Sequence, residues 1–360
     1  MALKFAINGF GRIGRCAARI LLNRPDTELV AINDTAKRDI TRYLLEHDSV
    51  HGKFNKKVEV INDDYIAVDG KKIRVFSTRD PNELEFKDFG AEVALECTGA
   101  FLTTQSCEVY IKNGLDLVVM SAPAKDDTPT FVMGVNNENY KGEKIISNAS
   151  CTTNCLGPIA KVLDAEFGIQ KGLMNTTHAY TSSQNLLDVK SKDYRRSRAG
   201  AINIIPTTTG AAKAISLVLP NLKDKMHGLS LRVPVPNVSM LDLTVLLEKN
   251  TTANEVNAKF KEYANSSMKG ILSVDEDYCV SSDFIGSSFS SIVAADMTQV
   301  VDKNMLKVLS WYDNEWGYSN RLIDLAIYAK NKNIKEGFEG DNAGEKKKPF
   351  VRKTKKRRQH

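Results

Sequence analysis

The sequence predicts an α/β protein built from a doubly wound sheet at the N-terminus and a second, α+β domain whose sheet is largely antiparallel. Three observations support this fold class. A glycine-rich turn at residues 9–14 joins a strand pattern to a helical pattern, and short apolar runs that end in loops follow it. Beyond residue 150 the apolar runs become longer and alternate with polar residues, as strands with one buried face do. The 360 residues suffice for two domains and an extension.

The first 150 residues repeat a pattern of buried strands and helices. The predicted elements are strands at residues 3–8, 28–33, 92–96 and 117–120, with a helix at residues 11–22 between the first two. A strand, a helix and a strand in this order form a βαβ unit, which favours a parallel, Rossmann-type sheet over residues 1–150. The helical pattern at residues 318–330 is expected to pack back onto this sheet, so a C-terminal helix at about 315–333 completes the domain.

Alternating stretches at residues 229–235, 241–247 and 306–311 predict strands of the second domain, which we expect to span residues 151–314. The last segment, residues 334–360, differs in composition. It holds ten Lys and Arg against four Asp and Glu, whereas the rest of the chain carries 40 of each sign. We expect this basic tail to be disordered and any binding of polyanions to be confined to it.

The composition argues against several classes of protein. With 42% hydrophobic and 26% charged residues the chain is typical of soluble globular proteins, and no apolar run approaches the roughly 20 residues that span a bilayer. The N-terminus lacks the features of a secretory signal, so the expected location is the cytoplasm. The six cysteines match neither a disulfide framework nor a zinc site, which predicts free thiols and no bound metal.

The string GFGRIG at residues 9–14 has the spacing of a dinucleotide-binding turn. Gly9, Gly11 and Gly14 permit the tight turn, the close approach of the backbone to a pyrophosphate and the packing of helix on strand. Asp34, after the second strand, is placed to accept hydrogen bonds from a ribose and to repel a 2′-phosphate, which favours NAD over NADP. The alternatives are a turn that only packs and an aspartate that only caps a helix or stabilises a turn. The nearby Lys37 and Arg38 weaken the argument for NAD without reversing it.

A cysteine and a histidine form the second candidate site. The string SNASCTTN at residues 147–154 leads into a helical pattern, so Cys151 is expected at a helix N-terminus, where backbone N–H groups and the helix dipole favour a thiolate. The polar, strand-like string NTTHAYT at residues 175–181 contains His178, whose imidazolium would stabilise that thiolate. On pattern alone, a structural role for this cysteine remains an equal alternative.

The motifs taken together resemble one family, the phosphorylating glyceraldehyde-3-phosphate dehydrogenases. The strings that carry the resemblance are NGFGRIG at residues 8–14, SNASCTTN at 147–154, HAYT at 178–181, IPTTTGAAK at 205–213, RVP at 232–234 and WYDNEWGY at 311–318. They occur in the family's order and spacing, and the resemblance runs from residue 3 to about residue 331.

The resemblance implies a glycolytic enzyme that converts glyceraldehyde 3-phosphate and inorganic phosphate to 1,3-bisphosphoglycerate while reducing NAD. Cys151 would form a thiohemiacetal and then an acyl thioester, with His178 as acid and base. The implied cofactor-binding residues are Gly9, Gly11, Arg12, Ile13, Gly14, Asp34, Arg79, Ser121 and Asn314. The implied substrate and phosphate contacts are Ser150, Thr152, Thr181, Thr209, Gly210 and Arg232.

Two positions depart from the pattern of many relatives, Ser183 and Lys190. The second places a cation where a neighbouring subunit's loop can approach the adenosine ribose, so some use of NADP is expected to be possible. The resemblance also implies a homotetramer, with the basic loop at residues 190–198 at a subunit interface. The alternatives are an erythrose-4-phosphate or a semialdehyde dehydrogenase, or a polyanion-binding protein that acts through the basic tail.

Overall fold

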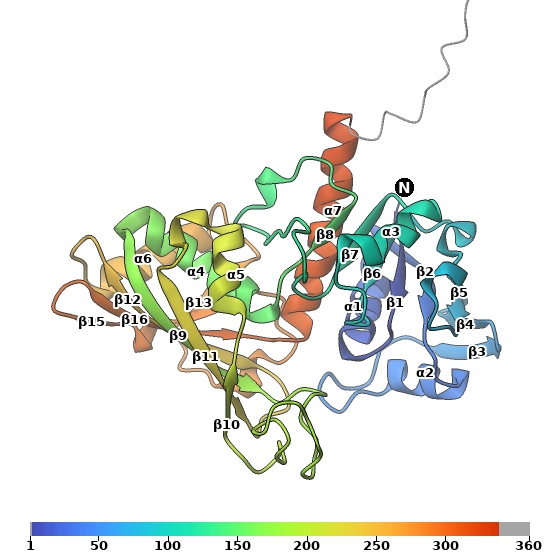
Figure 1. Cartoon of the computed structure of the whole chain (residues 1–360), viewed down its shortest axis with the longest axis horizontal. Coiled ribbons are helices and arrows are strands. Elements are labelled where there is room, and N and C mark those ends of the chain that lie inside the picture. The colour runs from blue at the N-terminus through green and yellow to red at the C-terminus, as the bar shows by residue number, and fades with distance from the viewer. Residues whose placement is uncertain (1, 338–360) are drawn as a thin grey trace, which may run out of the picture.

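The structure, a computed structural model, describes residues 2–337. Within that range the chain forms two eight-stranded sheets, each covered by its own helices, and the long helix α7 (Trp316–Glu336) stands between them (Figure 1). Helix α7 contacts both parts, because it packs against α1 (Arg12–Asn23) and β7 (Leu117–Met120) of the first and against α4 (Cys151–Phe167) of the second. The arrangement agrees with the predicted fold class.

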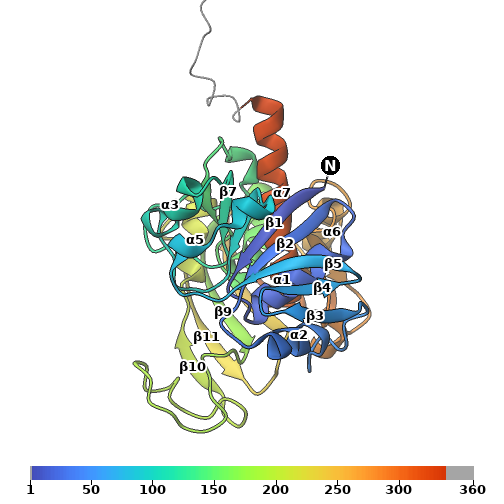
Figure 2. The same ribbon diagram turned by 90° about the vertical axis from the view of Figure 1, so that its right-hand side faces the viewer.

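The first sheet is the predicted doubly wound sheet. Its strands are β1 (Leu3–Asn8), β2 (Thr27–Asn33), β3 (Val58–Asn62), β4 (Tyr65–Val68), β5 (Lys71–Phe76), β6 (Val93–Glu96), β7 (Leu117–Met120) and β8 (Ile145–Ser147). They lie in the order β3-β4-β5-β2-β1-β6-β7-β8, and Figure 2 shows β1, β2, β5, β4 and β3 side by side. The five pairings from β5 to β8 are parallel. The helices of this part are α1 (Arg12–Asn23), α2 (Arg38–Glu46) and α3 (Thr104–Lys112).

At one edge of this sheet lie strands that the sequence did not predict, β3, β4 and β5, which pair antiparallel with one another. β3 ends with the exposed Ile61 and Asn62, and β5 begins with the exposed Lys71 and Lys72. Their apolar periodicity is therefore weak. By contrast, β6 and β7 are buried along their whole length, as parallel strands covered on both faces are.

The second sheet is mixed but mainly antiparallel. Its strands are β9 (Ile169–Ala179), β10 (Ile205–Thr208), β11 (Met226–Val233), β12 (Ser239–Leu247), β13 (Leu272–Asp275), β14 (Ser291–Ala294), β15 (Gln299–Val301) and β16 (Met305–Tyr312). They run in the order β10-β11-β9-β12-β16-β14-β13, with β15 paired to β16, and only the pairs β11/β9 and β13/β14 are parallel in the described chain. The helices α4 (Cys151–Phe167), α5 (Ala211–Val218) and α6 (Ala253–Ala264) lie on one face (Figure 1).

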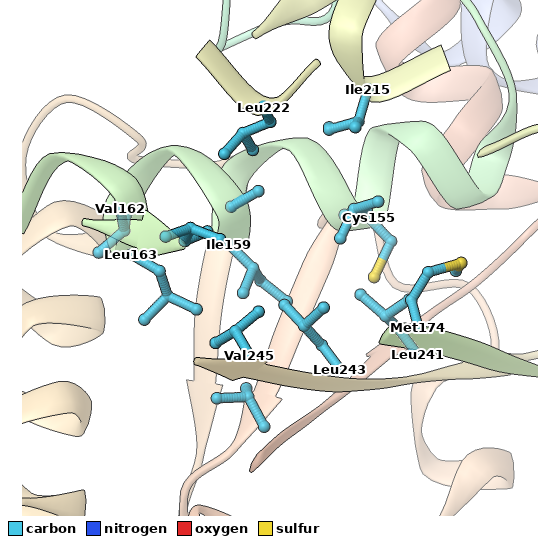
Figure 3. Close-up of a cluster of buried hydrophobic side chains, with 14 of the residues drawn as sticks. Cys155, Ile159, Val162, Leu163, Met174, Ile215, Leu222, Leu241, Leu243 and Val245 are labelled. Carbon is cyan, nitrogen blue, oxygen red and sulfur yellow. The ribbon is translucent and has the colours of Figure 1, made fainter. Parts of the chain in front are cut away.

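The core of the second part forms where α4 packs on this sheet. Figure 3 shows the helix residues Cys155, Ile159 and Leu163 above Leu241 and Leu243 of β12. All five are fully buried. Alternation along β12 places its other residues on the opposite face, which no helix of the described chain covers.

Helix α7 is longer than the sequence predicts. The expected end at residue 333 and the expected start of the tail at residue 334 are wrong, because the helix continues through Glu336 and ends at Gly337, which adopts a left-handed conformation (φ +72°). The apolar periodicity that ends at residues 331–333 marks the end of the buried face and not the end of the helix. The remainder of the basic tail, residues 338–360, lies outside the described residues. Among the helices of residues 2–337, none combines the length and apolar character needed to cross a bilayer.

A buried polar network joins the carboxyl ends of β1, β2 and β6. The Glu96 carboxylate accepts hydrogen bonds from Asn8 Nδ2 (2.9 Å), Tyr110 Oη (2.7 Å) and the backbone N–H of Thr98 (2.8 Å). Asn33 Nδ2 in turn donates to Asn8 Oδ1 (2.7 Å). Burial raises the pKa of Glu96, whereas these donors lower it. The network therefore fixes the strand ends that form the floor of the cavity described next.

Candidate active site

A cavity of about 500 Å³ opens at the carboxyl ends of the central strands of the first sheet. This position is the usual ligand site of doubly wound sheets, where the strand order reverses. The lining residues that the sequence predicted are Gly9, Gly11, Asp34 and Arg79. The other lining residues include Asn8, Asn33, Thr78, Cys97 and Thr98.

Each glycine of the turn at residues 9–14 is explained by the space around it. A Cβ on Gly9, which has φ +92°, would lie 2.7 Å from the backbone nitrogen of Thr98, and one on Gly14 would lie 2.1 Å from the carbonyl oxygen of Gly9. A Cβ on Gly11 would meet no protein atom within 4 Å. Gly11 therefore borders open space in the cavity, where a side chain would take the room of a ligand.

The N-terminus of α1 faces this space without a side-chain cap. The first-turn N–H groups of Arg12, Ile13 and Gly14 are left for an anion such as a pyrophosphate. The Arg12 side chain is engaged elsewhere, because its guanidinium forms ion pairs with Asp48 and Glu315. Any contact of Arg12 with a cofactor is therefore expected through its backbone. The cavity and this turn fit a dinucleotide.

Asp34 lines the cavity and also has a local role. Its Oδ1 accepts a hydrogen bond from the N–H of Ala36 (3.1 Å), and its Oδ2 accepts one from Thr41 Oγ1 (2.7 Å). These contacts fix the carboxylate at the rim of the cavity. Carboxylate oxygens have further lone pairs, so the same group can accept hydrogen bonds from ribose hydroxyls.

Two further predicted cofactor residues, Ser121 and Asn314, lie beyond the cavity. Ser121 follows β7, and its side chain hydrogen-bonds to Cys97, which does line the cavity. Asn314 lies between β16 and α7, and its Oδ1 accepts a hydrogen bond from Ser239 Oγ (2.8 Å).

Cys151 is the first residue of α4, as the sequence predicts. Ser150 caps the helix, since its Oγ accepts a hydrogen bond from the N–H of Thr153 (3.1 Å). The preceding residue, Ala149, has a left-handed backbone (φ +55°), and Tyr318 Oη donates to its carbonyl (2.9 Å). The chain thus makes a sharp, braced turn from β8 into α4, with the half-buried Cys151 at its tip.

His178, on β9, brings its imidazole to this sulfur. Cys151 Sγ and His178 Nε2 are 3.5 Å apart, and the imidazole is 4% exposed. The phenol ring of Tyr312 lies edge-on to it, and Tyr312 Oη contacts Thr152 Oγ1 (2.9 Å) and Thr176 Oγ1 (2.7 Å). The structure therefore places the predicted nucleophile and base within contact, from two elements that are distant in sequence.

The protonation of this pair differs from the sequence expectation of a thiolate and an imidazolium. Burial raises the pKa of Cys151, although the positive charge of Arg232 and the helix N–H groups lower it. Burial, followed by the charge of Arg232, lowers the pKa of His178 to about 3. Both groups are therefore neutral in this state, because the contacts around them do not compensate either charged form for the water that burial removes.

Two groups compete for Nδ1 of His178. The carbonyl oxygen of Ala179 lies 2.7 Å from it, and Arg232 Nη1 lies 2.6 Å from it. Nδ1 can donate to the carbonyl or accept from the guanidinium, but it cannot do both. When it donates to Ala179, Nε2 is unprotonated and faces the sulfur as a base. An anion that draws Arg232 away favours this tautomer.

The remaining predicted anion contacts are dispersed. The hydroxyls of Ser150 and Thr152 are engaged in the cap and with Tyr312. Thr209 Oγ1 accepts from the N–H of Ala211 (3.2 Å) at the start of α5, next to Gly210. The hydroxyl of Thr181 contacts that of Ser183 (2.8 Å). The strand register pairs Arg232 with Ile205 at the start of β10, whereas Thr209 lies just beyond the other end of that strand.

Sequence reasoning missed three residues of the site: Arg196, Tyr312 and Ser239. The charge of Arg196 lowers the pKa of both His178 and Arg232, so it lies close to them. Its Nε donates to Thr207 Oγ1 (2.8 Å). The five basic residues at positions 190–198 were a signal, but we assigned that loop only to a subunit interface.

A group of possible metal ligands lies elsewhere. One ligand atom each of Cys16, His51 and Glu315 lies within 4.8 Å of the others. However, the Glu315 carboxylate accepts hydrogen bonds from Arg12 Nε (2.8 Å) and from Arg12 Nη2, and its Oε2 lies 3.0 Å from His51 Nε2. A guanidinium at this distance opposes a cation, so we describe the group as an ion-pair network. The expected absence of a metal remains a prediction.

Comparison with known proteins gives concordant matches. The model for the NAD binding domain of glyceraldehyde 3-phosphate dehydrogenase matches residues 3–104, and the model for its C-terminal domain matches residues 150–314. The chain is 50% identical to the glyceraldehyde-3-phosphate dehydrogenase of Geobacillus stearothermophilus over 336 residues, which are 93% of this chain and all of that protein. It is 52% identical to the chloroplastic glyceraldehyde-3-phosphate dehydrogenase A of Chlamydomonas reinhardtii, over 90% of this chain and 88% of that one.

The buried imidazole predicts a pH dependence of stability. Because the pKa of His178 is lowered to about 3 from its ordinary value of 6.5, the unfolded chain binds a proton there between these pH values and the folded chain does not. The free energy of unfolding therefore decreases as pH falls from about 6.5 towards 3, because protonation of this histidine favours the unfolded chain. We expect His178→Asn to lose less stability than the wild type between about pH 7 and pH 4, measured by urea unfolding. Equal losses would contradict the assignment of a neutral imidazole.

Proposed function

Since the chain belongs to the glyceraldehyde-3-phosphate dehydrogenase family, we propose that it is the NAD-dependent, phosphorylating enzyme of glycolysis, which forms 1,3-bisphosphoglycerate. The observation that supports this most directly is the pairing of Cys151 Sγ with His178 Nε2 at 3.5 Å beside the guanidinium of Arg232. The division into an NAD-binding domain, residues 1–150 with α7, and a catalytic domain, residues 151–314, is part of the proposal.

The first step uses the neutral pair as the structure presents it. His178 Nε2 accepts the thiol proton while Cys151 Sγ forms a bond to the aldehyde carbon. The imidazole then returns that proton to the carbonyl oxygen, which gives a thiohemiacetal and a neutral His178. The N–H groups of Cys151 and Thr152, which act on the sulfur, stabilise the developing thiolate. The substrate's phosphate is the anion that draws Arg232 from Nδ1, so binding of the correct substrate favours the tautomer that acts as a base.

The second step removes the hydroxyl proton and a hydride from the same carbon. His178 Nε2 accepts the proton, and the carbon keeps its bond to sulfur as a thioester. Bound NAD supplies the hydride acceptor. Inorganic phosphate then attacks the thioester carbon, the C–S bond breaks, and the sulfur regains a proton from His178. We assign the two phosphate groups to Arg232 and Arg196, whose positive charges both act on the pKa of His178.

A homotetramer is also part of this proposal. Large apolar side chains are exposed on the uncovered face of the second sheet, among them Leu173 (67% exposed) and Met305 (48%). In the loop that joins β9 to β10, Leu187 is 77% exposed and Tyr194 is 93% exposed. Large apolar side chains exposed in this way are typical of subunit interfaces. A cytoplasmic location stays a prediction, since the similar proteins include chloroplastic forms.

The activity has a direct assay. We expect NADH absorbance to appear when the protein is mixed with NAD, glyceraldehyde 3-phosphate and inorganic phosphate. Without phosphate it should appear only as a burst of about one equivalent per Cys151, because the thioester is then not cleaved. Erythrose 4-phosphate, as the competing aldehyde, should give a lower kcat/KM. Sustained turnover without phosphate, or a preference for erythrose 4-phosphate, would overturn the proposal.

Substitution of two cysteines that lie one helical turn apart tests the assignment of the nucleophile. Cys151→Ser should lower kcat by on the order of 10³-fold or more, because a hydroxyl is a far weaker acid than a thiol, while NAD still binds. Cys155→Ser is the matched control, because the Cys155 sulfur is buried in the core (Figure 3). It lies 3.5 Å from Ser291 Oγ. This variant should keep most of the activity. Loss of turnover in both variants, or in neither, would refute the assignment.

The choice of cofactor is tested at the cavity rim. Asp34→Ala should raise kcat/KM with NADP relative to NAD, because it removes the repulsion of a 2′-phosphate. The variant also loses the hydrogen bonds to Ala36 and Thr41, so Asp34→Asn, which keeps similar contacts without the charge, serves as the control for structure. An NADP preference already present in the wild type would show that Lys37 or Lys190 outweighs the carboxylate.

A further inference from the structure

Ser239 lies at the point where the strands of the candidate active site meet. It is the first residue of β12, is fully buried, and pairs with Tyr312 of β16. The backbone N–H of Ala179, next to His178, donates to Ser239 Oγ (3.1 Å). Ser239 Oγ donates in turn to Asn314 Oδ1 (2.8 Å). One hydroxyl therefore links the strand of the catalytic imidazole to Asn314.

This chain of hydrogen bonds has only one direction. The N–H of Ala179 can only donate, so it occupies a lone pair of the serine oxygen and leaves the single hydroxyl proton for another acceptor. That acceptor is Asn314 Oδ1. If the amide of Asn314 were turned over, its Nδ2 would face Ser239 and the hydroxyl proton would lose its partner. Ser239 thus fixes which end of the amide points away from it.

The outward end of the amide is available to a ligand. Asn314 is 6% exposed, and no described protein group accepts a hydrogen bond from its Nδ2. The backbone on either side is held in place. Asp313 Oδ1 accepts hydrogen bonds from the N–H groups of Glu315 (2.9 Å) and Trp316 (2.7 Å), which fixes the turn from β16 into α7.

The backbone that delivers Ser239 is strained. Val238 has φ +67°, a left-handed conformation that a β-branched residue rarely adopts, and it is buried at 3% exposure. Strain of this kind persists where the surrounding structure requires a particular geometry. Here the conformation turns the chain so that Ser239 enters the sheet with its hydroxyl between Ala179 and Asn314.

We propose that Ser239 is a positioning residue that fixes the amide orientation of Asn314 and thereby selects one orientation of the nicotinamide carboxamide. The inference rests on the proposed function, in which Asn314 binds that carboxamide. A carboxamide presents a donor at one end and an acceptor at the other, so a fixed partner amide accepts only one of its two orientations. Bound NAD would then be held with one face of its nicotinamide ring towards Cys151.

The test measures the conformation of bound NAD without turnover. We expect transferred nuclear Overhauser effects between the nicotinamide and ribose protons to show a single glycosidic conformer with the wild type. With Ser239→Ala they should show a mixture of conformers, and the Kd for NAD should rise about tenfold, because the amide of Asn314 can then turn over. Ser239→Thr, which retains the hydroxyl, should restore the single conformer.

Turnover gives a second, independent readout. With substrate deuterated at the aldehyde carbon, the wild type should deliver deuterium to one face of the nicotinamide and Ser239→Ala to both. Ser310→Ala is the matched control, because it removes another fully buried hydroxyl of this sheet that contacts Ser291 and not Asn314. It should leave conformer and face unchanged. In combination with Asn314→Ala, the effect of Ser239→Ala on Kd should disappear.

The outcomes separate this inference from the proposed function. If the wild type binds NAD and Ser239→Ala still shows a single conformer and a single face, Ser239 only packs and the inference is wrong, even where kcat falls. The inference is also wrong if Ser310→Ala gives the same mixture of NAD conformers, since loss of any buried hydroxyl of this sheet would then produce it. A wild type that does not bind NAD would overturn the proposed function and this inference together.

Discussion

The close approach of Cys151 to His178 depends on one constraint, the packing of α4 on the second sheet. Helix α4 packs its apolar side against β12 and β9, and this contact fixes the position of its N-terminus relative to the sheet and the direction of its axis. Ser150 and the turn at Ala149 then determine where the first residue of the helix points. Because the imidazole comes from β9, which lies next to β12 in the same sheet, the core that holds the helix also holds the base. The geometry of the site is therefore a consequence of core packing.

The same burial that fixes the pair also keeps it neutral. Removing water raises the pKa of Cys151 and lowers that of His178, and Arg232 reinforces the second effect while it opposes the first. A thiol held in this state is a poor nucleophile until a base acts on it, and the base is available only when Nδ1 donates to Ala179. Arg232 stands at that nitrogen. The reactivity of the sulfur is thus coupled to the presence of an anion on the guanidinium, which is consistent with a site for phosphorylated substrates.

Much of the fold could be predicted from the sequence because its signals are local. The apolar runs at residues 3–8 and 117–120 coincide with β1 and β7, and the position of Cys151 at a helix start follows from a serine cap and small polar neighbours. The weakly periodic edge strands β3–β5 were missed, and the end of α7 was misplaced because Gly337 terminates the helix after the apolar face has ended. Glu96 and Ser239 carry no sequence signal of their own, whereas Arg196 lies in the basic loop at residues 190–198 and Tyr312 in the string WYDNEWGY at residues 311–318, neither of which indicates their roles. Their importance depends on contacts between segments that lie far apart along the chain, which composition and periodicity do not report.

Two residues in left-handed conformations, Ala149 and Val238, lie at the entrances of the two elements that carry the site. Each costs the folded state about 1–3 kcal/mol, and neither is a glycine that would reduce this cost. Glycine at either position would also enlarge the freedom of the segment that delivers Cys151 or Ser239. Both side chains are buried in the core, and this burial makes each strained turn rigid. Strain is thus retained at these two turns, where a small displacement would separate the sulfur, the imidazole and the amide. By contrast, Gly11 stands where a ligand would approach the backbone.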